Sequence, residues 1–313
     1  MSFSGMVKEE LSRQVSTARH CRIAEIAALL SACGRMTADG ILHFQTENYA
    51  VVRKYFTLLT KTFNIDTAIA IRESCQMKKG KVYFVEIADP AQIETVLQGT
   101  KLSADKCSGE TLYAGNGLVI QQSCCKRAFI RGAFLASGSI SDPEKGYHFE
   151  IVCSDEQKAG QLRELIRSFE IDAKIVMRKK LYVVYVKEGA QIVDMLAVME
   201  ANVALMNLEN IRIVKEMRNT VNRKVNCETA NINKTVSAAV KQIEDIRFIQ
   251  MSSAFDELPE SLQEMAELRV RYPEATLAEL GQLLDTPVGK SGVNHRLKKI
   301  SLFADELRER HHQ

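Results

Sequence analysis

The sequence lacks any hydrophobic run long enough to cross a membrane. A spanning helix needs roughly 18 or more consecutive apolar residues, and no stretch of the 313 residues approaches that length. The first ten residues also lack the apolar core of a secretory signal peptide. We therefore expect a cytoplasmic protein with no membrane partner.

The sequence also lacks a Cys-x-x-Cys pair, although it contains 8 cysteines. The adjacent pair Cys124-Cys125 is poorly suited to chelating one ion, so the spacing predicts neither a metal site nor a cofactor. A chain of this length and apolar content does not need disulfide bonds for stability. We expect its thiols to be reduced.

Strong overall charge is missing as well, because the net charge is only +3. The length allows about two or three domains, each with its own core. The basic character is local: no acidic residue occurs between Asp285 and Asp305. A negatively charged partner is therefore expected to bind at this segment.

This acid-free segment has the pattern of a helix-turn-helix. An apolar helix from Thr276 to Leu284 and a turn around Pro287 precede a second helix, which runs from Lys290 to about Phe303. Thr276 and Glu279 suit a cap and first turn of the first of these helices. Its apolar stripe at i, i+4 and i+7 consists of Val293, Leu297 and Ile300. A solvated surface helix is the alternative interpretation. The preceding helix, the turn and a polar face whose charges are all positive together favour DNA binding.

The polar face of the second helix carries the expected DNA contacts. Base edges in the major groove are the predicted targets of Asn294, His295 and Arg296. Phosphates are the predicted targets of Lys290, Lys298 and Lys299. Two hydroxyl residues complete the expected set, Thr276 and Ser291.

The first two thirds of the chain contain an internal repeat. Ile26–Gly34 matches Ile130–Gly138, and the two glycines are 138 − 34 = 104 residues apart. Two further matches follow in the same order at offsets of 106 and 99, namely 63–66 with 169–172 and 81–85 with 180–184. Such ordered matches indicate duplication.

Each copy is predicted to be an α+β unit with an antiparallel sheet. A small-residue helix ends at a glycine suited to a C-terminal cap. One strand, a second helix, two alternating strands and a last helix follow. Their expected ranges are 40–46, 49–63, 66–73, 81–87 and 90–98 in the first copy, and 147–153, 155–169, 172–178, 180–187 and 189–200 in the second.

Two segments join these units. The stretch from Leu102 to Cys125 contains Gly115-Asn-Gly117, which we interpret as a turn because no Lys-Ser/Thr follows it. The stretch after residue 218 is polar, with helical apolar spacing from about Thr229 to Gln250. It predicts either accessory phosphate contacts or a polar connector packed on the second repeat, and the candidate contacts are Arg223, Lys224 and Lys234.

The paired helices resemble the signature of the LAGLIDADG homing endonucleases, whose two αββαββα halves meet through small residues. The small residues here are Ala27, Ala28, Ala32, Gly132, Ala133 and Ala136. The resemblance implies a metal-binding acid next to each terminal glycine, but those positions hold Cys33 and Ser137. Asp39 and Asp142 could replace the acids, although their neighbours Gly40 and Pro143 favour turns. We therefore expect no catalytic residues.

Three stretches together resemble the WhiA family of bacterial regulators: 126–139, 218–235 and 276–300. The resemblance implies a duplicated αββαββα LAGLIDADG-like domain followed by an all-α helix-turn-helix domain. The expected segments are two repeats at 1–100 and 126–218, a connector at 101–125, a polar linker or helix at 219–254 and the DNA-binding domain at 255–313.

The resemblance also implies a function: a nucleoid-associated protein that binds double-stranded DNA, regulates transcription and acts in sporulation or in cell division and chromosome segregation. The composition favours the division role. Other regulatory or division proteins are possible partners. The alternatives are a residual metal-dependent endonuclease and an interaction scaffold that binds DNA weakly.

The role of the doubled domain stays open between a second DNA surface and a platform for proteins. Its strands carry the basic residues Arg72, Lys78, Lys79, Lys81, Lys174, Arg178, Lys179 and Lys180.

Overall fold

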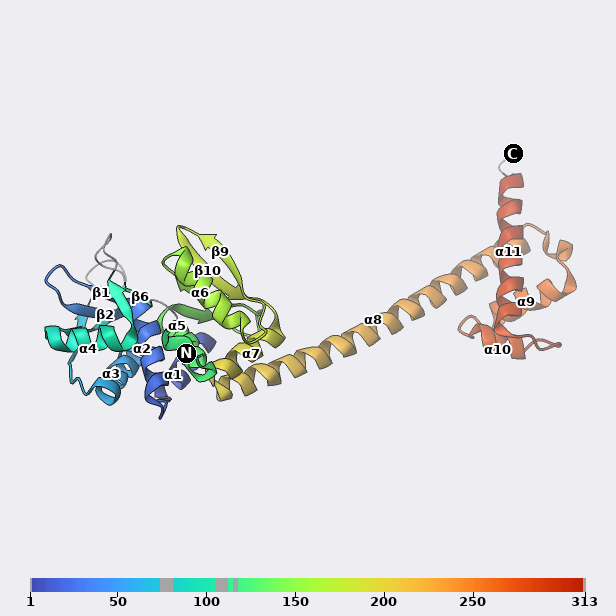
Figure 1. Cartoon of the computed structure of the whole chain (residues 1–313). Helices are drawn as coiled ribbons and strands as arrows, with labels where there is room; N and C mark the ends of the chain where they lie inside the picture. Colours follow the sequence, from blue (N-terminus) through green and yellow to red (C-terminus); the bar gives the residue numbers. More distant parts are fainter. Residues whose placement is uncertain (1, 74–80, 105–111, 115–117, 312–313) are drawn as a thin grey trace. The chain divides into compact units, whose positions relative to one another are not determined.

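The computed structural model describes residues 2–73, 81–104, 112–114 and 118–311 (Figure 1). The chain separates into two compact units, Met1–Lys215 and Glu216–Gln313. None of the helices in these described ranges is both long enough and apolar enough to span a bilayer. The finer division into five segments stays a prediction.

The first unit contains the two repeats that the sequence predicts. The first copy consists of α2 (Arg19–Cys33), β1 (Gly34–Met36), β2 (Leu42–Thr46), α3 (Tyr49–Phe63), β3 (Ile69–Glu73), β4 (Lys81–Ile87) and α4 (Pro90–Thr100). The second consists of α5 (Ser123–Ser137), β7 (Gly138–Ile140), β8 (Phe149–Cys153), α6 (Glu156–Arg167), β9 (Lys174–Arg178), β10 (Leu181–Val186) and α7 (Gly189–Met199). Both have the order αββαββα, which confirms the predicted fold class.

The two four-stranded sheets have the same antiparallel topology. Their strand orders are β1-β2-β4-β3 and β7-β8-β10-β9. In each copy the residue that ends the signature helix starts the edge strand, with Gly34 opposite Phe44 and Gly138 opposite Ile151. Between the copies lie a two-stranded sheet of β5 (Leu102–Ala104) and β6 (Leu112–Ala114) and the 3-10 turn η1 (Leu118–Ile120). The predicted turn at 115–117 lies outside the described residues.

The alternation of apolar and polar side chains did not predict the short strands β1 and β7, because three residues are too few to show it. Gly34 and Gly138 are the C-cap residues of α2 and α5, as predicted, but neither adopts the left-handed conformation that favours glycine. Gly34 has φ −92° and Gly138 has φ −79°, both in extended backbone. Gly138 is needed for space instead, since an added Cβ would lie 2.2 Å from Cδ2 of Phe134.

The acids considered as substitute metal ligands are turn residues, as predicted. Asp39 lies in the turn that Gly40 closes with φ +76°, and the Gly40 N–H donates to the Thr37 carbonyl. Asp142 accepts a hydrogen bond from the Glu144 N–H at 3.0 Å through its side chain. Both acids therefore lie in turns, and the Asp142 carboxylate also stabilises its own turn.

The signature helices α2 and α5 pack closely side by side, as their small residues predict. An added Cβ at Gly132 would lie 2.7 Å from the Glu25 carbonyl oxygen and 2.9 Å from Cβ of Ala28. Ala27 and Ala28 are buried, whereas Ala32 is exposed near the end of α2. The close approach is therefore concentrated in the middle of the two helices.

A buried ionic network crosses this helix pair. The Glu25 carboxylate is fully buried and lies 2.9 Å from the Lys54 ammonium and 3.1 Å from Nε of Arg131. Arg131 also pairs with Glu200 at 2.7 Å, and Lys54 donates to the Leu11 carbonyl at 3.0 Å. Charges buried so deeply are tolerated because each is paired and hydrogen-bonded.

An N-terminal helix that the sequence analysis did not place, α1 (Phe3–Arg13), covers part of this core. The Ser2 side chain accepts a hydrogen bond from the Gly5 N–H at 3.1 Å and so caps the helix. Phe3, Val7 and Leu11 recur at four-residue spacing and are buried against α3 and α5. That spacing was a readable signal of an amphipathic helix.

The helix predicted from about residue 229 is longer than expected, because α8 runs without a break from Asn202 to Met251. Residues 216 to 238 are exposed on all sides of it. After η2 (Phe255–Glu257), the second unit continues with α9 (Glu260–Arg271), α10 (Leu277–Gln282) and α11 (Lys290–His311). Helix α11 extends beyond the expected end near Phe303 because Ala304 and Leu307 continue its buried stripe.

Candidate nucleic-acid interface

The first helix of the predicted motif begins with a capping box. Thr276 Oγ1 accepts from the Glu279 N–H at 3.3 Å, while Glu279 Oε2 accepts from the Thr276 N–H at 2.7 Å. The hydrogen bond from this backbone N–H lowers the pKa of the Glu279 carboxyl. The predicted cap is confirmed, and the exposed Thr276 hydroxyl keeps its own proton to donate elsewhere.

The turn between α10 and α11 depends on a glycine. The Val288 N–H donates to the Gly281 carbonyl at 3.0 Å, and an added Cβ at Gly281 would lie 2.2 Å from the Val288 carbonyl oxygen. The Asp285 N–H donates to the Glu264 carboxylate at 2.7 Å, which fixes the turn to α9. The angle at which α11 leaves the turn is therefore set by backbone packing.

Helix α11 separates an apolar face from a polar one, as predicted. Val293, Leu297 and Ile300 are at most 1% exposed, in a core that also contains Ile246 and Ile249 of α8. Arg296 is half-buried at the border between the two faces. The remaining expected contacts are exposed: Lys290, Ser291, Asn294, His295, Lys298 and Lys299.

The described residues do not neutralise the positive charge of this face. Across the described part of the molecule, no carboxylate lies within ion-pair distance of the α11 cations Lys290, Arg296, Lys298 and Lys299. Arg308, near the other end of α11, pairs with Asp305 at 2.8 Å and with Asp245 of α8 at 2.7 Å. These pairs fix the far end of α11 to α8.

A groove in the second unit joins α8 to the helix-turn-helix. It brings together Lys234, Thr276, Lys290 and Asn294, all of which the sequence marked as candidate contacts. Their clustering was not predictable because Lys234 is 56 residues before Lys290 (290 − 234 = 56). Arg223 and Lys224 are exposed on α8 but do not line this groove, so their DNA contacts stay predictions.

The groove also contains a residue that the sequence analysis missed, Arg269. Its side chain is only 2% exposed, and it donates to the Ala275 carbonyl at 2.7 Å while its Nε has no hydrogen-bond partner in the described part of the chain. Desolvation lowers the pKa of the Arg269 guanidinium. The sequence feature that could have indicated Arg269 is its position on the apolar face of α9, in line with Leu262 and Met265. A buried guanidinium without a carboxylate suits an anionic ligand.

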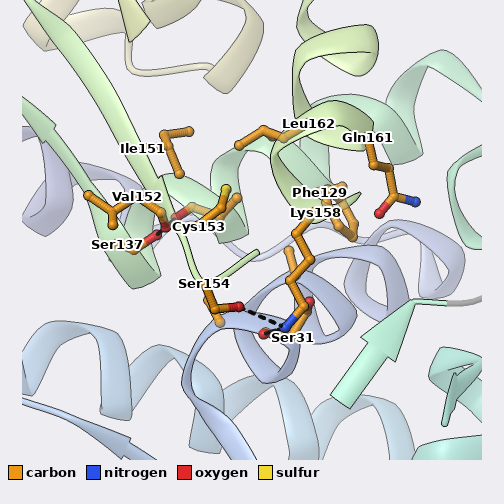
Figure 2. A pocket seen from close by; sticks show the side chains of 13 residues that line it. Ser31, Phe129, Ser137, Ile151, Val152, Cys153, Ser154, Lys158, Gln161 and Leu162 are labelled. Carbon is orange, nitrogen blue, oxygen red and sulfur yellow. Dashed lines mark hydrogen bonds between the residues drawn. The ribbon is translucent and has the colours of Figure 1, made fainter. Parts of the chain in front are cut away.

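The position of the nuclease chemistry in the first unit is filled by neutral groups and a cation. Figure 2 shows the pocket at the end of α5, where Ser137 replaces the expected acid. Ser137 Oγ donates to the Val152 carbonyl at 2.7 Å, and the Lys158 ammonium donates to the Ser31 carbonyl at 2.9 Å. An ammonium at this place repels a divalent cation, and a serine hydroxyl is a poor replacement for a carboxylate ligand.

The equivalent position in the first repeat is no better suited to a divalent metal. Cys33 is half-buried, and desolvation raises the pKa of its thiol to about 11, with Lys8 acting in the opposite direction. The thiol is therefore neutral near pH 7. A neutral thiol offers Mg²⁺ neither charge nor a hard oxygen ligand.

Three family models match this chain in the order of its structural parts. They are the WhiA N-terminal LAGLIDADG-like domain at residues 19–103, the WhiA LAGLIDADG-like domain at 126–218 and the WhiA C-terminal HTH domain at 221–304. Together they cover most of the sequence, including both signature helices and most of α11.

Curated relatives match over the full length. A probable cell division protein WhiA of Lachnoclostridium phytofermentans is 58% identical over 99% of this chain and 100% of its own. Another from Alkaliphilus oremlandii is 46% identical over 99% of this chain and 98% of its own. The crystal structure of full-length DUF199/WhiA from Thermatoga maritima shares the fold with a TM-score of 0.61, at 24% identity over 98% of this chain and 99% of that one. The family models and the full-length identity together show that the chain belongs to the WhiA family, with a WhiA-type DNA-binding role.

Proposed function

We propose that the protein is a sequence-specific DNA-binding regulator that acts on cell division and chromosome segregation and does not cleave DNA. The observation that carries the proposal is the α11 face, where exposed donors and cations project on the side opposite a buried apolar stripe. A helix of this kind fits the major groove, with its first turns against base edges.

The roles of the individual residues follow from their position on α11. Asn294, His295 and Arg296 lie in the second turn and are assigned to base edges, while Lys298 and Lys299 are assigned to phosphates. Ser291 is assigned to the edge of the same surface.

The groove beside α11 is assigned to one strand of the DNA backbone. Lys234, Thr276 and Lys290 offer donors around it, and Arg269 supplies a partly unsatisfied guanidinium from its wall. Phosphate oxygens satisfy such donors without reading sequence. Arg223 and Lys224 extend this positive surface along α8.

The absence of cleavage is part of the proposal. Cys33 and Ser137 lack the paired carboxylates that would hold a metal ion, and Lys158 brings a positive charge to the second position. Incubation of the purified protein with plasmid and Mg²⁺ or Mn²⁺ tests this, and metal-stimulated strand scission would sink it.

Chromatin mapping paired with transcript profiling tests the regulatory role. We expect discrete binding sites near genes whose transcripts change when residues 255–313 are deleted. Binding that persists after this deletion would instead support the scaffold hypothesis. Discrete sites without transcript changes would favour a chromosome-organising role, with nucleoid association but no transcription control.

A further inference from the structure

The N-terminal ends of α2 and α5 bring together four side chains that no part of the DNA-binding proposal uses. They are His20, Cys21, Cys124 and Cys125. Their ligand atoms all lie within 4.8 Å of one another. Cys21 and Cys125 are buried, whereas His20 and Cys124 are exposed, so the cluster has a dry inner side and an open outer side.

The distances suit four ligands around a single centre. Nδ1 of His20 lies 3.2 Å from Sγ of Cys125, 3.4 Å from Sγ of Cys21 and 3.9 Å from Sγ of Cys124. A tetrahedral zinc ion with Zn–S near 2.3 Å and Zn–N near 2.0 Å requires N–S separations of about 3.5 Å. An ion at the centre thus needs only small side-chain movements.

The duplication explains how the cluster arises. His20 and Cys124 are 124 − 20 = 104 residues apart, and Cys21 and Cys125 are also 125 − 21 = 104 apart. This is the offset of the two signature glycines, so each repeat contributes the same two positions from the first turn of its signature helix.

We infer that His20, Cys21, Cys124 and Cys125 bind one zinc ion that clamps the two repeats together at the start of α2 and α5. Thiolate and imidazole ligands select zinc over Mg²⁺ or Ca²⁺. Four protein ligands leave no open coordination position, so the ion is structural and activates no water. Spacing within one segment does not reveal the site, because each repeat supplies only two adjacent ligands and the set of four is completed across the helix pair.

The metal content of the purified full-length chain tests the inference. The test variants are Cys124→Ser and His20→Ala, because both side chains are exposed and their replacement spares the core. Cys227→Ser is the matched control, since Cys227 is an exposed cysteine on α8 outside the cluster. We expect stoichiometric zinc in the wild type and the control, and loss of most of it in both test variants.

The thermal stability of the protein supplies a second measurement, which does not require counting the zinc retained during purification. A chelator should lower the melting temperature of the wild type and the control but leave that of Cys124→Ser unchanged. Cobalt(II) added to the reduced chain should give a thiolate-to-metal absorption band that Cys124→Ser weakens.

Two results would overturn the zinc site. One is a reduced, folded wild type that takes up no zinc or cobalt, or takes up only as much as Cys124→Ser does. The other is a disulfide between Cys21 and Cys125 in protein isolated without oxygen, because that bond would remove two of the four ligands.

Discussion

In residues 1–215 the buried cations are matched by acceptors, whereas the cations on the polar face of α11 meet no acid in the described part of the chain. Lys54 and Arg131 share the buried Glu25 carboxylate, and even on the sheet Arg178 lies 3.4 Å from Glu150. Helix α11, in contrast, carries its lysines in the stretch between Asp285 and Asp305, where the sequence has no acidic residue. The difference teaches that this chain uses the same residue types for two purposes: to hold its doubled domain together and to offer charge to a partner.

Three of the basic residues of the sheets, Arg72, Lys174 and Arg178, have a partner within the chain. Lys174 pairs with Asp172 at 3.4 Å, and Arg72 lies over the Phe84 ring at 5.6 Å. Lys78 and Lys79 lie outside the described residues. Lys179 and Lys180 are exposed in the β9–β10 turn, so they remain the best candidates for a second DNA surface.

The largest effect is expected from breaking the buried network. Glu25→Ala removes the buried carboxylate that Lys54 and Arg131 share, although Arg131 keeps Glu200 as a partner, and we expect a loss of about 3–5 kcal/mol in the free energy of unfolding. Urea denaturation of the full chain measures it. Glu94→Ala, an exposed acid of the same unit, is the control and should change stability by less than about 0.5 kcal/mol. If Glu25→Ala also changes stability by less than about 0.5 kcal/mol, the buried ion pairs do not hold the doubled domain together.

The next largest effect is expected on DNA affinity and tests the polar face of α11. Arg296→Ala should weaken binding to a cognate site by about 1–3 kcal/mol if the guanidinium reads a base. Fluorescence anisotropy on cognate and random duplexes measures the two affinities. Arg178→Ala serves as the paired-cation control and should change neither. Equal losses on both duplexes would reassign Arg296 to the phosphate backbone.

The salt dependence of DNA affinity also tests whether the α11 lysines bind phosphates while lysines with an acidic partner do not. The combined change Lys298→Gln and Lys299→Gln should reduce the slope of log affinity against log salt by about 1 for each phosphate that a lysine no longer neutralises. Lys174→Gln should leave that slope unchanged, because Lys174 is engaged by Asp172. A wild-type slope near zero would contradict the electrostatic account altogether.

The smallest effect concerns the β9–β10 turn. Lys179 and Lys180 adopt φ +48° and +68°, a conformation that favours Asn-Gly and costs lysine about 1 kcal/mol or more. Lys179→Asn with Lys180→Gly should therefore stabilise the first unit by roughly 1–2 kcal/mol in thermal unfolding. If the same change also weakens DNA binding, the doubled domain touches DNA and the two roles are not separate.

Elements with a strong local pattern were predictable. The capping box at Thr276 and Glu279 and the stripe of Val293, Leu297 and Ile300 lie close together in sequence, and the structure confirms both. The strands β1 and β7 escaped because three residues show no period. Arg269 escaped because its role depends on the groove formed with α8.

The sequence by itself determined the duplication, the order of the longer helices and strands within each copy, the presence of Cys33 and Ser137 where the resemblance implies acids, and the acid-free stretch between Asp285 and Asp305. These features depend on residue type and on spacing within a few turns. Only the tertiary structure decided that Lys158 faces the pocket beside Ser137, that Lys234 joins Lys290 in one groove and that His20 and Cys21 meet Cys124 and Cys125. Each of these groupings joins segments that are distant in the chain, and packing of the helices, not local propensity, brings them together.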